Sequence, residues 1–205
     1  ILREIGDRAR EGSSLNNIGE TYYNLGHYEE ALGYCEQALI IAQEAGNKAE
    51  EGDSLNNIGA IYEKIGEYEG SLDYHKQALA IFQEIGDRAR EGVSLNNIGA
   101  VYDSLGEYEK ALDFYKQALT IAQYFNDRAG EGVNLNNIGG IYSRLGEYKE
   151  ALDYYKQALV INRDIGDRSG EGTNLNNIGE IYTQLGEYEK ALDYYEQSIA
   201  IFREI

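Results

Sequence analysis

The sequence contains no proline, tryptophan or methionine, and only one cysteine and two histidines among its 205 residues. A single cysteine, Cys35, excludes an internal disulfide framework and suits a reducing compartment, so we expect a cytoplasmic protein. His27 and His75 have no plausible partner for a nucleophilic set, and a Cys35–His75 metal pair would have to bridge adjacent repeats about 10 Å apart. We therefore expect a protein that is not an enzyme and binds no metal or cofactor.

Positive charge is also scarce, with 18 Lys and Arg against 36 Asp and Glu and a formal net charge of −18. Nucleic acids and anionic membranes both require a basic surface, so this balance excludes them as partners. No apolar run approaches the length of a membrane span, no signal peptide is visible, and the glycines do not form a phosphate-binding loop. An acidic surface favours neutral or basic partners through electrostatic steering.

What the sequence does contain is a repeat. The motif Leu-Asn-Asn-Ile-Gly recurs with a constant spacing of 40 residues, beginning at Leu15, Leu55, Leu95, Leu135 and Leu175. A fixed period of this size is typical of a solenoid, in which each repeat buries its apolar face against its neighbours. We predict a single array over residues 1–205, in which residues 1–5 end a preceding repeat and the whole repeats are residues 6–45, 46–85, 86–125, 126–165 and 166–205. Because the chain starts without Met and ends in apolar Ile205, we expect it to belong to a longer array.

Residues 86–125 predict a helical hairpin. Asp87 is a good N-cap, and apolar residues then recur at spacings of three and four up to Leu105. Gly106 is expected to close the hairpin turn, and a second helix is expected from about Tyr108 to Phe125. The second helix of each repeat is expected to end in a left-handed residue, for which Asn126 replaces the glycine of Gly6, Gly46, Gly86 and Gly166. Further glycines inside the first helices, such as Gly19 and Gly59, predict close approach of a neighbouring helix backbone.

Ile98-Gly99 and Tyr102, followed by Ala111, Tyr115 and Ala118, resemble the tetratricopeptide repeat motif, and the resemblance covers essentially the whole chain. The family's frequent Trp is replaced here by Leu, and its frequent Pro is absent. The longer 40-residue form resembles the repeats of kinesin light chains and of multi-repeat bacterial signalling proteins. The resemblance implies an all-α fold, a right-handed α-solenoid of helical hairpins with a leading partial helix, and first helices that line a concave groove.

Each first helix carries a second stripe opposite its core stripe, and this stripe holds the paired Asn residues. Asn is a poor helix former, so its repetition in mid-helix requires a reason. Because Asn has two donors and an acceptor oxygen, a row of Asn can bind the backbone of an extended peptide. The candidate peptide-binding residues are Asn16, Asn17, Asn56, Asn57, Asn96, Asn97, Asn136, Asn137, Asn176 and Asn177, with Val93, Val133, Lys64 and Arg144 for specificity.

Three roles remain open for the Asn pairs: bonds between neighbouring helices, contacts to a ligand, or one column of Asn for each role. Three functions also remain open. The first is a scaffold that binds an extended peptide in the groove. The second is a structural array that self-associates head to tail through uncapped ends bearing Ile1, Ile5, Ile201 and Ile205. The third is a sensory module of a larger signalling protein.

Overall fold

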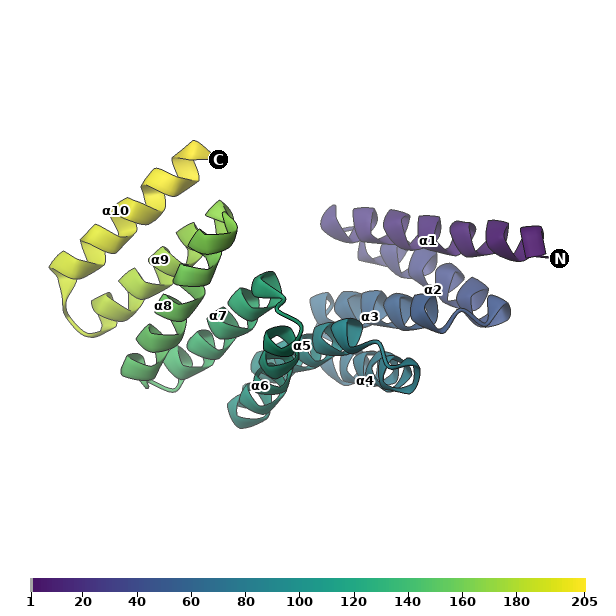
Figure 1. Cartoon of the computed structure of the whole chain (residues 1–205), viewed down its shortest axis with the longest axis horizontal. Helices are drawn as coiled ribbons and strands as arrows, with labels where there is room; N and C mark the ends of the chain where they lie inside the picture. Colours follow the sequence, from purple (N-terminus) through teal and green to yellow (C-terminus); the bar gives the residue numbers. More distant parts are fainter. Residues whose placement is uncertain (1) are drawn as a thin grey trace. The chain divides into compact units, whose positions relative to one another are not determined.

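The computed structural model describes the backbone of residues 2–205 and the side chains of Arg8 and of residues 10–205. This part of the chain is all helical and divides into two compact units, Ile1–Gly106 and Glu107–Ile205. Unit 1 contains α1 (Leu2–Asn24), α2 (Tyr28–Ala45), α3 (Lys48–Lys64), α4 (Tyr68–Ile85) and α5 (Arg88–Ser104). Unit 2 contains α6 (Tyr108–Tyr124), α7 (Arg128–Arg144), α8 (Tyr148–Ile165), α9 (Arg168–Gln184) and α10 (Tyr188–Glu204) (Figure 1).

Within each unit, successive helices pack as hairpins. In unit 1 α1 pairs with α2 and α3 with α4, while α2 packs on α3 and α4 on α5. In unit 2 α7 pairs with α8 and α9 with α10, while α6 packs on α7 and α8 on α9. The first helices are also neighbours, since α3 contacts both α1 and α5, and α7 contacts α9. The predicted all-α hairpin fold is confirmed.

Local sequence explains where the helices begin and end. The Asp87 carboxylate caps α5 by accepting a hydrogen bond from the backbone N–H of Arg90 at 3.1 Å, which satisfies one of the free donors of the first turn. Gly106 closes its turn with a φ of 73°, and Asn126 takes the left-handed conformation with a φ of 56°, as its place in the glycine column predicts. Asn126 is the one non-glycine residue with positive φ in the described chain.

One predicted boundary is wrong. Gly6 was expected to end a helix, but α1 runs without a break from Leu2 to Asn24 and contains it. Residues 2–5 make little more than one helical turn, which is too short to persist as a separate helix. Each residue that extends α1 adds one backbone hydrogen bond, whereas a separate helix would first have to nucleate, which is unfavourable. The segment therefore joins the first helix of the following repeat.

The core lies between the two helices of each hairpin. Ile58, Ile98, Ile138 and Ile178 of the repeated motif are fully buried, and Ala31, Ala111 and Ala151 of the second helices are buried with them. The tyrosines that follow the motif are half-buried and pack against these clusters, as Tyr62 and Tyr142 do. The Leu, Ile and Gly of the motif therefore serve packing.

Candidate functional site

The predicted site residues lie on the first helices of the two units. We call the surface formed by the Asn pairs and their neighbours the Asn face. In unit 1 it contains Asn16 and Asn17 of α1, Asn56, Asn57 and Lys64 of α3, and Val93, Asn96 and Asn97 of α5. In unit 2 it contains Val133, Asn136, Asn137 and Arg144 of α7, with Asn176 and Asn177 of α9.

In unit 1 the first Asn of a pair connects neighbouring helices. The Asn16 amide donates to the Ser54 hydroxyl at 2.9 Å, and the Asn56 amide donates to the Ser94 hydroxyl at the same distance. Ser54 in turn donates to the Glu50 carbonyl at 2.9 Å. Asn16 and Asn56 are both buried, so these bonds are shielded from water. They link α1 to α3 and α3 to α5.

Asn56 also fixes which ring nitrogen of His75 carries a proton. Its oxygen lies 2.9 Å from His75 Nδ1, and because its amide already donates to Ser94, the oxygen must accept from an Nδ1–H. Burial lowers the pKa of His75 to about 4, so the ring is neutral near pH 7. This arrangement joins the second helix α4 to the same bond network.

In unit 2 the pattern changes. The column that supplies Ser54 and Ser94 in unit 1 holds Asn134 and Asn174 here, and their amides donate to the carbonyls of Gly130 and Gly170 on their own helices. The bond between α7 and α9 instead runs from the Asn177 amide to the Asn136 oxygen at 3.0 Å. One member of the second Asn column thus has a role between helices.

The second Asn is more accessible than the first in two of the three pairs of unit 1. Asn17 is exposed, whereas Asn57 and Asn97 are half-buried, and these three side chains make no hydrogen bond within the described part of the chain. The half-buried Ala60 and Ala100 lie one helical turn away and leave space above the helices. Val93 and Val133 are 54% and 52% exposed, so both offer an apolar contact to a ligand.

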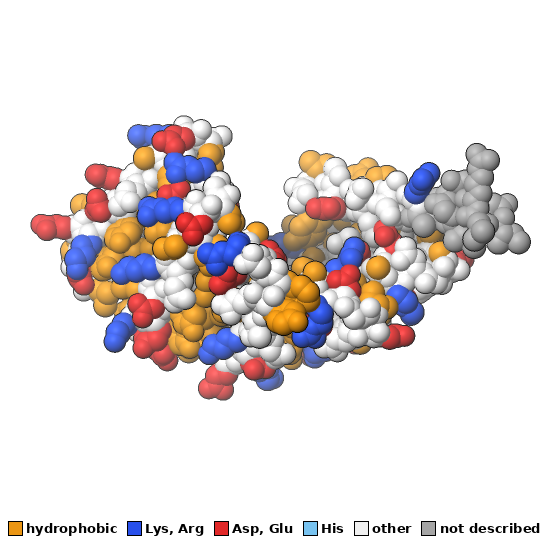
Figure 2. Space-filling view, viewed as in Figure 1, with side chains coloured by type: hydrophobic (Ala, Val, Ile, Leu, Met, Phe, Trp, Pro, Cys, Tyr) orange, Lys and Arg blue, Asp and Glu red, His pale blue; other side chains and the backbone are white. Residues whose placement is uncertain are grey.

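The charges of the unit 1 Asn face are largely paired. The Arg90 guanidinium holds the Asp53 carboxylate at 2.9 Å and also binds Asp87. Burial raises the pKa of Asp53 although Arg90 opposes the shift. Burial also raises the pKa of Glu63, and the nearby Lys64 ammonium opposes it. In Figure 2 acidic and basic side chains are likewise interspersed over unit 2. The Arg163 guanidinium and the Glu171 carboxylate form an ion pair in this unit at 2.8 Å.

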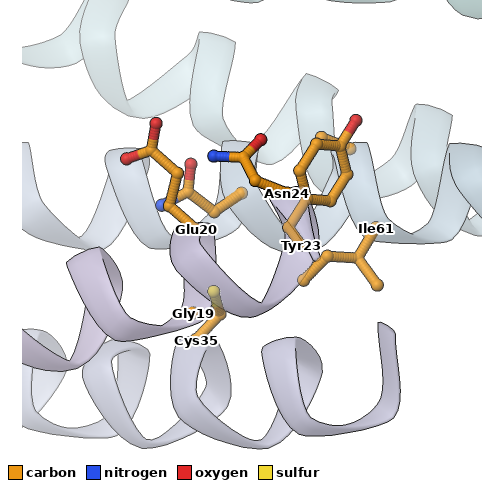
Figure 3. Close-up of a pocket in the computed structure, with 8 residues that line it drawn as sticks. Gly19, Glu20, Tyr23, Asn24, Cys35 and Ile61 are labelled. Atoms are coloured by element: carbon orange, nitrogen blue, oxygen red, sulfur yellow. The ribbon is translucent and has the colours of Figure 1, made fainter. Parts of the chain in front are cut away.

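A pocket of about 170 Å³ opens on the Asn face of unit 1, between α1 and α3. Its lining consists of Gly19, Glu20, Tyr23, Asn24, Cys35, Asn57, Ala60 and Ile61. Figure 3 shows the Cys35 sulfur directed toward Gly19, and the side chains of Glu20, Tyr23 and Asn24 extending from α1. Burial raises the pKa of Cys35 to about 11, with Glu20 and Glu36 adding to the shift, so the group remains a thiol near pH 7.

A second pocket, of about 370 Å³, lies on the Asn face of unit 2, and most of the residues that line it are polar. Side chains of Asn136, Asn162, Asp167, Thr173 and Asn174 contribute to it. Among the described residues there is no group of three or more His, Cys, Asp and Glu side chains that could hold a metal ion. No described helix is long and apolar enough to cross a membrane.

Two features of the first helices differ from the prediction or were missed. The internal glycines were expected to admit a neighbouring backbone, and at Gly19 the backbone oxygen of Ala31 does lie 3.2 Å from an added Cβ. A Cβ at Gly59, Gly139 or Gly179, by contrast, would lie within 2.9 Å of the ring of His75, Tyr155 or Tyr195. A side-chain ring is therefore what these glycines accommodate. The pocket was also missed, although its signal is in the sequence: Cys35 occupies the column of the larger Tyr115, Tyr155 and Tyr195.

Consecutive helical hairpins with a shared polar face define a helical-repeat protein. A family model described as the tetratricopeptide repeat matches residues 10–84, 50–123 and 131–204. The chain therefore belongs to the tetratricopeptide repeat family. A comparison with curated proteins finds no match.

Several solved structures share this fold. BtubC (BKLC) from P. vanneervenii has a TM-score of 0.80 and 19% identity, and the match covers 99% of this chain and 91% of BtubC. A Rap protein complexed with competence and sporulation factor has a TM-score of 0.84 and 22% identity, over 95% of this chain and 54% of the Rap protein. A putative kinesin light chain from Podospora anserina has a TM-score of 0.74 and 16% identity, over 96% and 97% of the two chains. The chain thus spans about half the length of the Rap protein, and these identities establish the fold alone.

Proposed function

We propose that the chain is a non-catalytic scaffold that binds an extended peptide segment of a partner protein on its Asn faces. The observation that carries the proposal is that the two Asn columns of unit 1 differ in burial and in hydrogen bonding. Asn16 and Asn56 are buried and bonded between helices, whereas Asn57 and Asn97 are accessible and make no hydrogen bond within the described chain. A side-chain amide in that state can bind the N–H and C=O groups of an added backbone.

The surroundings of these amides support the same proposal. Ala60 and Ala100 are small, so a peptide backbone can approach the helices, and the exposed Val93 offers an apolar contact for its side chains. The net charge of −18 favours peptides that are neutral or basic. The related Rap structure contains competence and sporulation factor, which is consistent with a binding role for this fold.

The register of 40 residues runs through both units, which supports the proposal that residues 1–205 are one repeat array. In unit 2, Asn137, Asn176, Arg144 and Val133 are assigned to peptide binding on the Asn face of that unit. Because Asn177 already donates to Asn136, we expect those two residues to contribute less to binding than Asn57 and Asn97.

A random peptide library displayed on phage and selected against the purified chain tests the proposal. Selected peptides should carry no net negative charge, and the Asn57→Ala/Asn97→Ala double variant should bind them about tenfold more weakly, because two hydrogen bonds are lost. The matched control is Gln37→Ala/Gln77→Ala, which removes two exposed amide side chains from α2 and α4. Failure to select any peptide, or equal affinity for both double variants, would refute the proposal.

One observation favours a second candidate, head-to-tail self-association. On α10 the apolar Leu192 and Ile199 are 61% and 48% exposed, whereas Leu152 and Leu159, the equivalent residues of α8, are buried by packing on α9. The side chains of Ile1 and Ile5, expected to contribute to the opposite end, lie outside the described residues. Sedimentation velocity over a wide concentration range tests this candidate. If it is correct, the chain forms larger species that Leu192→Lys removes and Gln197→Lys leaves unchanged, whereas a monomer throughout rejects it.

A further inference from the structure

The pocket of unit 1 lies where α2 carries a small side chain in place of a ring. Cys35 occupies the column that holds Tyr155 in α8 and Tyr195 in α10. In unit 2 the Tyr195 ring lies over Gly179, and its hydroxyl is 3.3 Å from the Thr183 hydroxyl on α9. The ring therefore fills the space above the glycine, along the surface of the first helix.

The residues of α9 and α10 around that ring correspond to the part of the pocket lining that α1 and α2 supply. Gly19 corresponds to Gly179, Tyr23 to Thr183 and Cys35 to Tyr195. A Cβ at Gly19 would lie 2.5 Å from Cys35 Sγ, so the small thiol rests on the glycine as the rings do. The thiol ends there, however, and the space that a ring would fill beyond it remains open.

The size of the pocket matches one six-membered ring. Its volume is about 170 Å³, and an apolar cavity of about 150 Å³ is known to bind benzene. Its inner wall consists of Gly19, Cys35, Ala60 and the buried Ile61, and a thiol sulfur is a favourable neighbour for an aromatic ring. The Asn24 and Asn57 amides at the pocket can bind a hydroxyl or a peptide group, and the Glu20 carboxylate disfavours an anionic occupant.

We propose that this pocket binds a phenylalanine or tyrosine side chain of the partner peptide, in the place that Tyr155 and Tyr195 occupy in their own repeats. The proposal rests on the proposed peptide-binding function and adds a specificity pocket to it. An indole is larger than one ring, and an aspartate or glutamate would meet Glu20. Peptides with a single-ring aromatic residue are therefore selected over peptides with Trp or an acidic residue at that position.

The first test uses the ring alone, with p-cresol and toluene as the probes for Tyr and Phe side chains. Methyl NMR spectra of the Ile residues are recorded during the titration. Both probes should saturate with dissociation constants on the order of 1 mM and should shift the Ile61 methyl resonances through the ring current. Ile181 occupies the equivalent position in unit 2, where Tyr155 fills the space, and its resonances serve as the control within the same molecule.

Substitutions at the pocket separate specific binding from weak surface binding. Cys35→Tyr supplies the ring from the chain itself and should abolish the Ile61 response, whereas Cys35→Ala keeps the space open and should preserve it. If Cys35→Tyr does not fold, Ala60→Leu narrows the pocket from α3 and should weaken binding at least about tenfold. Absence of saturable Ile61 shifts, or equal binding to Cys35→Ala and Cys35→Tyr, overturns the proposal.

The same variants distinguish failure of the aromatic pocket from failure of the peptide-binding function on which the pocket proposal rests. A library peptide that binds through Asn57 and Asn97 with equal affinity to wild type and Cys35→Tyr overturns the aromatic pocket and leaves the scaffold standing. Saturable p-cresol binding without any selected peptide supports the pocket and contradicts the scaffold. If both are correct, replacing the aromatic residue of a selected peptide by Ala and introducing Cys35→Tyr each weaken binding at least about tenfold.

Discussion

Replacing Asn56 by Ala should destabilise unit 1 far more than the same replacement at Asn97. Both positions lie in the middle of a first helix, so the gain in helix propensity from Asn to Ala is nearly equal and cancels in the comparison. What differs is the bonding. Asn56 is buried and serves two partners, whereas Asn97 is half-buried and makes no hydrogen bond within the described chain.

The loss of stability in Asn56→Ala follows from the polar groups that lose their hydrogen-bond partner. Asn56→Ala leaves the buried His75 Nδ1–H without its acceptor, which costs about 1–3 kcal/mol, and it also removes the bond to Ser94, worth about 1 kcal/mol. The expected loss is about 2–4 kcal/mol relative to Asn97→Ala. With a urea dependence of about 3 kcal/mol per molar, the unfolding midpoint falls by about 1 M.

Urea unfolding at pH 7.5, followed by circular dichroism at 222 nm, measures this difference. Asn97→Ala should unfold within about 0.2 M of the wild type, since accessible residues without bonds contribute little. Midpoints that agree for the two variants would refute the assignment of Asn56 to the helix contacts. A large loss in both would show that both Asn columns hold the array together, and would remove the accessible amides on which the binding proposal depends.

Three further predictions concern other features of the fold. Burial lowers the pKa of His75 to about 4, so as the pH falls below about 6.5 the unfolded chain takes up a proton before the folded chain does. His75 should therefore lower the free energy of unfolding by about 2 kcal/mol between pH 7.5 and pH 5. His75→Tyr should remove this part of the pH dependence in urea unfolding. Gly33→Ala should raise the thermal midpoint, because nothing lies within 4 Å of the added Cβ and Ala favours the helix by about 1 kcal/mol. Gly139→Ala should lower the thermal midpoint, because its Cβ would lie 2.8 Å from the Tyr155 ring. Calorimetry of the two variants should therefore show changes of opposite sign. Native Cys35 should react with Ellman's reagent at pH 8 at least about a hundredfold more slowly than in 6 M guanidinium, because the thiol is buried and its pKa is raised to about 11; equal rates would contradict the buried position.

The sequence predicts the parts of this fold that depend on local chemistry. Asp87 caps a helix because its side chain reaches the next free N–H groups, and Asn126 replaces glycine because it tolerates the left-handed conformation. Each needs only residues nearby in the chain. The wrong prediction that a helix ends at Gly6 also has a local cause. A glycine ends a helix only where the chain on both sides forms separate helices.

The roles of the Asn pairs could not be predicted, because they depend on distant residues. Asn56 is a helix contact because Ser94 and His75, from the next repeat and the paired helix, come within 2.9 Å of it. In unit 2 the exchange of that serine for Asn174 redirects the bond to Asn177. The pocket likewise depends on the size of Cys35 against Gly19 and on the position of α3.

We propose that the accessible Asn amides bind a peptide while the buried ones hold the helices together. The side-chain amide resonances of assigned, ¹⁵N-labelled Asn test this division most directly during titration with a library-selected peptide. We expect the Asn57 and Asn97 amide resonances to shift and to exchange more slowly with water, whereas those of Asn16 and Asn56 keep their positions. Shifts confined to residues outside the Asn faces, with Asn57 and Asn97 unchanged at saturation, would contradict it.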